Sequence, residues 1–96
     1  MKIEFDDNYF MSKAIDEAKI ALSKGEVPVG AVIVADNKII ARAHNMVEAL
    51  NDVTAHAEIL AITSASNYIG GKYLENCSIY VLSLIHISEP TRRYAI

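Results

Sequence analysis

The sequence predicts an α/β fold: a three-layer α/β/α sandwich made of a helix, a β-hairpin, a second helix and a strand, abbreviated at its C-terminal end. Two observations predict it. Helical and strand-like spacings of apolar residues alternate along the chain in that order. The 96 residues, of which 52% are hydrophobic and 22% charged, suffice for one small domain with a buried core.

The first helix is predicted to begin after Asp6, Asp7 and Asn8, which are residue types that cap helix N-termini. Gly25 stands where a glycine commonly follows a helix end. Between them one face is apolar and the other polar. The apolar residues are Met11, Ala14, Ile15, Ala18, Ala21 and Leu22, and the polar ones are Lys13, Asp16, Glu17 and Lys24. This spacing predicts an amphipathic helix.

A β-hairpin is predicted next. Val29–Ala35 is rich in β-branched residues and apolar on both faces, which is typical of a buried strand. Asp36 and Asn37 form a turn signal. Lys38–His44 then follows as the paired strand, and the polar stretch from Asn45 to Val53 is predicted to be a loop.

A second helix and a third strand complete the predicted elements. Asp52 or Thr54 is expected to cap the helix, and its apolar side is expected to hold Ile59, Leu60 and Ile62. Its end is expected at Asn67, Gly70 and Gly71. The strand is predicted from Ser78 to about Ile87.

Composition narrows the class of protein. The net charge of −3 gives no basic excess, so any contact with RNA needs a local patch, a partner subunit or a further segment. The one cysteine, Cys77, allows no intrachain disulfide. No signal peptide is recognisable, and the longest apolar run, Val27–Ala35, is too short to span a membrane. We therefore expect a cytoplasmic protein with no membrane contact.

The residues with most chemical potential lie at the predicted start of the second helix. His56 and Glu58 can project into one pocket in front of a helix N-terminus. A neutral imidazole can bind a metal there, and a carboxylate two residues on can move a proton for metal-bound water. The alternative is a surface histidine and a glutamate that complements the helix dipole. The tripeptide alone leaves both open.

A wider set of blocks surrounds this motif, in a consistent order and spacing. They are Glu26–Val34, His44–Asn45, Asp52 with Thr54–Ala61, Tyr73–Leu74 and Ser78–Val81. Together with H-x-E, half of the zinc-deaminase signature, they resemble the bacterial tRNA adenosine deaminase family of the cytidine and deoxycytidylate deaminase superfamily. The resemblance covers roughly residues 3–81 and implies a cytidine-deaminase-like fold.

The resemblance also implies roles for five residues. His56 would be the first zinc ligand, and Glu58 the general acid/base that moves a proton from zinc-bound water to the purine ring and the leaving amine. Asn45 would hydrogen-bond a flipped nucleotide, the Ala57 N–H would hold the base edge, and Val29 would pack on the base. Both residues also have a purely structural explanation, because Asn45 is a good loop residue and Val29 a good strand residue. The implied reaction is hydrolytic deamination of adenosine to inosine at the wobble position of a tRNA anticodon stem-loop, by a homodimer.

The sequence departs from the family after Val81, where the family continues T-L-E-P-C-x-x-C. The two cysteine positions hold His86 and Glu89, and Cys77 is upstream and expected to be a buried apolar residue. One explanation is an altered zinc site of His56, His86 and Glu89. The favoured explanation is a foreign tail, because Leu82 and the residues after it resemble a translated sequencing-library adapter.

The domain prediction follows from that choice. Residues 1–81 are a partial nucleobase deaminase domain, and residues 82–96 are a non-native tail in which apolar and polar residues alternate and could prolong the third strand. The chain itself is then expected to be inactive, because the Zn²⁺ site lacks both cysteine ligands. Two alternatives stay open: a guanine or cytidine-type deaminase of the same superfamily, or a non-enzymatic module with a deaminase-like shell.

Overall fold

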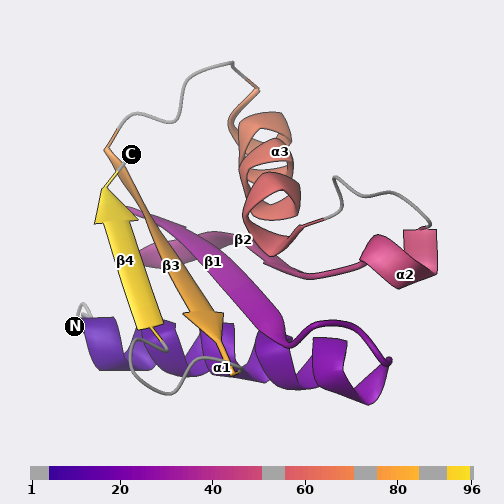
Figure 1. Ribbon diagram of the computed structural model, residues 1–96. Helices are drawn as coiled ribbons and strands as arrows, with labels where there is room; N and C mark the ends of the chain where they lie inside the picture. The colour runs from indigo at the N-terminus through magenta and orange to yellow at the C-terminus, as the bar shows by residue number, and fades with distance from the viewer. Residues whose placement is uncertain (1–4, 51–55, 71–75, 85–90, 96) are drawn as a thin grey trace.

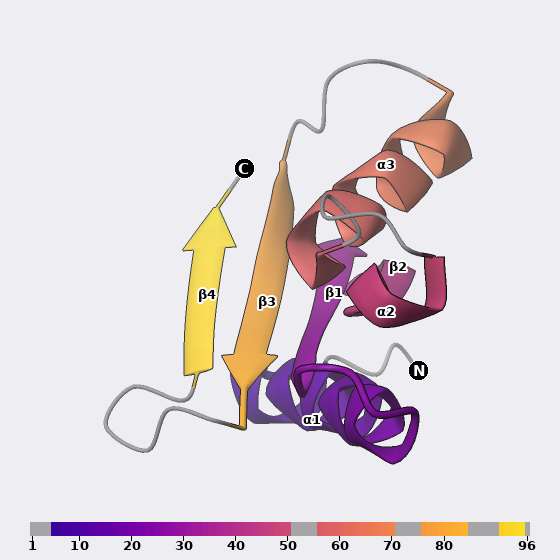
Figure 2. The same ribbon diagram turned by 45° about the vertical axis from the view of Figure 1, so that its right-hand side comes forward.

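Two helices pack on opposite faces of one sheet in the computed structural model of the chain (Figures 1 and 2). The structure describes residues 5–50, 56–70, 76–84 and 91–95. The strand order is β2-β1-β3-β4, and every neighbouring pair is antiparallel. The predicted three-layer sandwich is confirmed. Within the described ranges no helix combines the length and apolarity that crossing a membrane requires.

Helix α1 (Asp7–Ser23) forms as predicted, because both of its ends carry the expected signals. The Asp6 side chain accepts a hydrogen bond from the Tyr9 N–H at 2.9 Å, and Gly25 adopts a φ of +76° just beyond the helix. The burial of two residues is the opposite of what their predicted helix faces imply. Leu22 is 57% exposed, whereas Glu17 is only 8% exposed because it points toward β2.

The hairpin has the predicted bounds, β1 (Val29–Ala35) and β2 (Lys38–His44). Asp36 and Asn37 have φ values of 51° and 61°, the left-handed conformation that two-residue hairpin turns require. A register shift follows Ile33 in the β1–β2 ladder. Strand β1 is the centre of the fold, since α1 covers one of its faces and α3 the other.

The segment after β2 differs from the predicted loop, because a short helix, α2 (Val47–Leu50), forms there. Helix α3 (Ala57–Ile69) has His56 at its N-cap position. The expected caps Asp52 and Thr54 lie outside the described residues. At the other end Gly70 closes α3 with a φ of 78°, as predicted.

The predicted end of α3 is only partly right. Asn67 lies inside the helix rather than at its end, and Gly71 lies outside the described residues.

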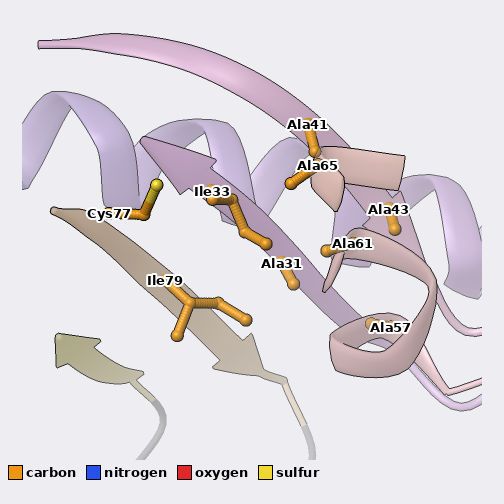
Figure 3. Close-up of a cluster of buried hydrophobic side chains, with 9 residues drawn as sticks. All are labelled: Ala31, Ile33, Ala41, Ala43, Ala57, Ala61, Ala65, Cys77 and Ile79. Atoms are coloured by element: carbon orange, nitrogen blue, oxygen red, sulfur yellow. The ribbon is translucent and has the colours of Figure 1, made fainter. Parts of the chain in front are cut away.

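The packed face of α3 is made of small residues rather than large ones. Ile59 and Ile62, which we expected to be packed, are 48% and 42% exposed. Figure 3 shows three alanines of α3 among the buried side chains on this face of the sheet. The cluster consists of Ala31, Ile33, Ala41, Ala43, Ala57, Ala61, Ala65, Cys77 and Ile79, and Leu60 packs against it as expected. Alanines spaced four apart let the helix approach the sheet closely.

Strand β3 (Cys77–Ser83) begins one residue before the predicted strand and ends sooner. Leu82 and Ser83 of the tail belong to the strand, but Leu84, which the predicted strand included, already lies in a bend, and residues 85–88, whose alternation suggested a prolongation, lie outside the described residues. A strand that the sequence did not predict, β4 (Thr91–Ala95), pairs antiparallel with β3 and forms one edge of the sheet.

Candidate functional site

Three of the five predicted site residues meet at one end of the sheet. Val29 opens β1, and Asn45 directly follows β2. The Asn45 N–H donates to the Val29 carbonyl at 3.2 Å. The Asn45 Oδ1 in turn accepts from the Ala57 N–H, the first amide of α3, at 2.8 Å. The end of the hairpin is thereby tied to the start of α3.

Asn45 acts as a helix cap supplied from another element. Helix N-termini leave N–H groups without intrahelical partners, and a nearby side-chain oxygen usually satisfies one of them. The N-cap residue of α3, His56, makes no such side-chain bond. Asn45, which is only 4% exposed, takes over this role across 12 residues of sequence. No local pattern signals such a distant cap, and the sequence analysis missed it.

His56 and Glu58 project from this same helix end, one on each side of Ala57 in the sequence. Both side chains are exposed. His56 has an extended backbone (φ −82°, ψ 150°), and Glu58 lies in the first turn of α3. The partial positive charge of a helix N-terminus stabilises a carboxylate in that position. All five predicted site residues therefore lie at the junction of β1, β2 and α3, which we call the α3 junction.

The Ala57 N–H already has a partner in this geometry. The family resemblance implies that this N–H holds the edge of a bound base, whereas in the structure it donates to the Asn45 Oδ1. Because the Asn45 Oδ1 is engaged by this bond, the Asn45 Nδ2 is the group that could donate to a ligand.

The described residues do not by themselves fit a catalytic zinc ion. Such a site uses three protein ligands, and no group of three or more His, Cys, Asp or Glu side chains that could hold a metal gathers in the part of the chain that the structure describes. His56 supplies one nitrogen. The two alternative ligands, His86 and Glu89, lie outside the described residues.

Cys77 cannot join His56, because it lies at the far end of the sheet. In the β1–β3 ladder Cys77 is opposite Ala35, whereas Ser83 is opposite Val29. Six residue steps along a strand span about 20 Å. Figure 3 shows Cys77 and Ala57 at opposite ends of the buried cluster, and Cys77 is 3% exposed. Its predicted structural role is consistent with this placement.

Strand β3 leaves the sheet beside the α3 junction. Ser83 pairs with Val29, and the Leu84 N–H donates to the Pro28 carbonyl at 3.0 Å. Ligands placed shortly after β3 in the sequence would consequently start from the same end of the sheet as His56.

A buried glutamate that the sequence analysis did not single out lies just before β1. Glu26 is 5% exposed, and its Oε1 accepts from the Glu48 N–H at 3.0 Å. This bond holds α2 against the segment that leads into β1. The partners are 22 residues apart, so local spacing gives no signal for it.

Comparison with known families agrees with this arrangement. The family model of the cytidine and deoxycytidylate deaminase zinc-binding region matches residues 5–90. The chain belongs to this deaminase family. A tRNA-specific adenosine deaminase from Aquifex aeolicus is 58% identical over 73 residues, which are 76% of this chain and 48% of the relative. One from Bacillus subtilis is 49% identical over 75 residues, 78% of this chain and 47% of the relative.

The chain thus spans about half the length of the curated relatives it matches. Two solved structures are similar to this chain in fold. One, from a study of A-to-I editing by tRNA:A34 deaminases at the wobble position of transfer RNA, has a TM-score of 0.76 and 45% identity over 78% of this chain and 58% of that one. The other, a guanine deaminase from Bacillus subtilis, has a TM-score of 0.76 and 38% identity, and the match covers 80% of this chain and 50% of that one. The predicted deaminase family and fold are confirmed.

Proposed function

We propose that this chain is the N-terminal part of a tRNA adenosine deaminase that converts adenosine to inosine at the anticodon wobble position. The observation that carries the proposal is the 58% identity with the tRNA-specific adenosine deaminase of Aquifex aeolicus, which spans three quarters of the chain. The geometry supports a deaminase, because His56 and Glu58 emerge from the α3 junction beside Asn45 and Val29.

In this proposal Glu58 holds and moves the proton. Its carboxylate is exposed at the first turn of α3, where it can reach a bound base. Asn45 donates from Nδ2 to the flipped nucleotide, and Val29 packs on the base. The Ala57 N–H keeps its bond to Asn45 and contributes by fixing that side chain; releasing it to the base edge would leave the buried Asn45 Oδ1 without this donor.

His56 is the one residue of the described set that we propose as a zinc ligand. Its side chain is exposed and makes no capping bond, so its imidazole is available to a metal. The remaining ligands have to come from residues that the structure does not describe or from a continuation that this sequence lacks.

Residues 82–96 are, in this proposal, not native. The cysteine pair of the family pattern is missing after Val81, and the curated relatives align over 73–76 residues, whereas the family model extends to residue 90. A P-C-x-x-C segment placed after β3 would begin at the α3 junction, where His56 needs partners. Sequencing the source genome beyond the Val81 codon tests this. A continuation with the cysteine pair is the expected result, and a continuation identical to the present tail would contradict it.

A chimera tests the substrate. Residues 1–81 are joined to the C-terminal part of the Aquifex aeolicus relative and assayed on an anticodon stem-loop and on free guanine. Guanine is the second candidate because the Bacillus subtilis guanine deaminase has the same TM-score as the tRNA:A34 structure. We expect inosine in the stem-loop and no xanthine. Xanthine without inosine would make the chain a guanine deaminase. The absence of both products would favour a non-enzymatic module.

We further propose that the complete protein is a cytoplasmic homodimer. Helix α3 exposes Ile59, Ile62 and Ile69 (48%, 42% and 44%), whose spacing places them along one stripe, and such a stripe is suited to pairing with another subunit. Analytical ultracentrifugation of the chimera should show a dimer that Ile62→Glu dissociates, with Thr63→Glu on the same helix as the control. A monomeric wild-type chimera would contradict the proposal.

A further inference from the structure

A buried carboxylate joins α1 to the end of β2. Glu17 is 8% exposed, although the sequence places it on the polar face of α1. Its Oε2 accepts from the Arg42 Nε at 3.1 Å, and its Oε1 lies 3.1 Å from the His44 Nδ1. Burying a charged group is unfavourable unless it is paired and hydrogen-bonded, so this arrangement needs a reason.

Gly30 allows Glu17 to reach these partners. It stands opposite His44 in the β1–β2 ladder, on the face that α1 covers. A Cβ added at Gly30 would lie 2.2 Å from the Ala14 carbonyl oxygen and 2.8 Å from the Glu17 Cβ. The helix backbone therefore rests directly on the strand, at the level at which Glu17 meets His44.

Glu17 restricts the orientation and the tautomer of the His44 ring. A carboxylate only accepts hydrogen bonds, so the His44 Nδ1 must carry a proton to bond with it. The His44 Nε2 is buried and has no hydrogen-bond partner among the described residues. A proton on Nε2 would be buried without an acceptor, so of the two neutral tautomers the one with its proton on Nδ1 fits this site. Glu17 thus selects both the orientation and the tautomer of this ring.

The residue after His44 is Asn45, which holds the α3 junction through its bonds to Val29 and Ala57. We propose that Glu17 is a positioning residue: by fixing His44 it holds Asn45, and through Asn45 the start of α3, in the geometry that the active site uses. The catalytic meaning of this role rests on the proposed function, whereas the linkage itself is a property of this chain.

Amide hydrogen exchange in the 96-residue chain tests the linkage. Glu17→Ala is expected to speed exchange of the Ala57 N–H about tenfold, the effect of losing one hydrogen bond's worth of local stability. Core amides such as that of Val32 should change less than about twofold. His44→Ala should have the same effect as Glu17→Ala, and the double variant no larger one. Asp16→Asn, a charge change on the same helix at a residue paired with Lys13, is the matched control and should leave Ala57 unchanged.

A second variant adds a spectroscopic signature that general destabilisation would not produce. In Glu17→Gln an amide that accepts from Arg42 can only donate to the His44 Nδ1, and this bond requires a bare Nδ1, so the ring proton should move to Nε2 even though Nε2 has no acceptor. Nitrogen NMR of the imidazole reads this tautomer directly. The proposal is overturned if Nδ1 keeps its proton and Ala57 exchange matches wild type. It is also overturned if hydrogen exchange of the Ala57 amide and of the core amides speeds up equally in Glu17→Ala and Glu17→Gln, as it would if the variants simply unfolded.

Enzyme activity gives a separate test. In an active chimera, Glu17→Ala should raise KM for the anticodon stem-loop about tenfold with a smaller change in kcat, because it displaces the nucleotide contact and spares Glu58. A chimera without any deaminase activity would count against the proposed function, and the exchange and tautomer measurements would still decide the role of Glu17.

Discussion

Gly30→Ala should be the most damaging of the glycine-to-alanine changes at the described glycines. The added Cβ would lie 2.2 Å from the Ala14 carbonyl oxygen and 2.5 Å from the Ala18 nitrogen, and both are backbone atoms of α1 that no rotamer change can move. The helix must shift off β1, which also draws Glu17 away from His44. Overpacking of a well-packed core costs about 1–3 kcal/mol, and we expect the upper end because backbone is involved.

The expected loss of unfolding free energy in Gly30→Ala is large enough to measure directly. A loss of about 3 kcal/mol is a large part of the about 5–15 kcal/mol that a small domain has, and should lower Tm by about 15 °C. Urea unfolding followed by circular dichroism measures it. Gly70→Ala is the control: it has a φ of +78° with nothing within 4 Å of the added Cβ, so backbone strain alone should cost about 1 kcal/mol. Equal losses at the two glycines would refute the argument from close packing.

Four further substitutions separate local contributions to the free energy of unfolding, each measurable by urea titration. Asp6→Ala removes the cap bond to Tyr9 and should cost about 1 kcal/mol; no loss would mean that the cap is replaced by water. Ile33→Ala empties a fully buried site and should cost about 3 kcal/mol, whereas Ile62→Ala on the exposed stripe should cost under about 0.5 kcal/mol. Asn45→Ala leaves the first N–H of α3 without its acceptor and should cost about 2 kcal/mol, with the loss concentrated in α3.

Local signals were enough to locate most of the elements. Asp6 and Gly25 mark the ends of α1, and the strands of the hairpin have the predicted bounds around the Asp36–Asn37 turn. Each of these features depends on the conformations that one residue and its immediate neighbours allow. The deaminase family could be predicted for the same reason, since its blocks are local and ordered.

Contacts between distant residues were what sequence patterns missed. Glu17 has the polarity of a surface residue, and its burial follows from partners 25 and 27 residues away. Asn45 caps a helix that begins 12 residues later. On α3, hydrophobicity favours Ile59 as the packed residue, but the fully buried positions of the helix are Ala57, Ala61 and Ala65, which let it lie close to the sheet, and Ile59 is left exposed.

Inosine formation by the chimera of residues 1–81 with the Aquifex aeolicus C-terminal part tests the central claim most directly. Nucleoside mass spectrometry of a tRNA anticodon stem-loop should show inosine at the wobble position with wild-type residues 1–81. Glu58→Gln should reduce the rate at least about a hundredfold, the lower range of a general acid/base contribution. Inosine formed equally well by the Glu58→Gln chimera would contradict the assignment of the α3 junction as the catalytic centre.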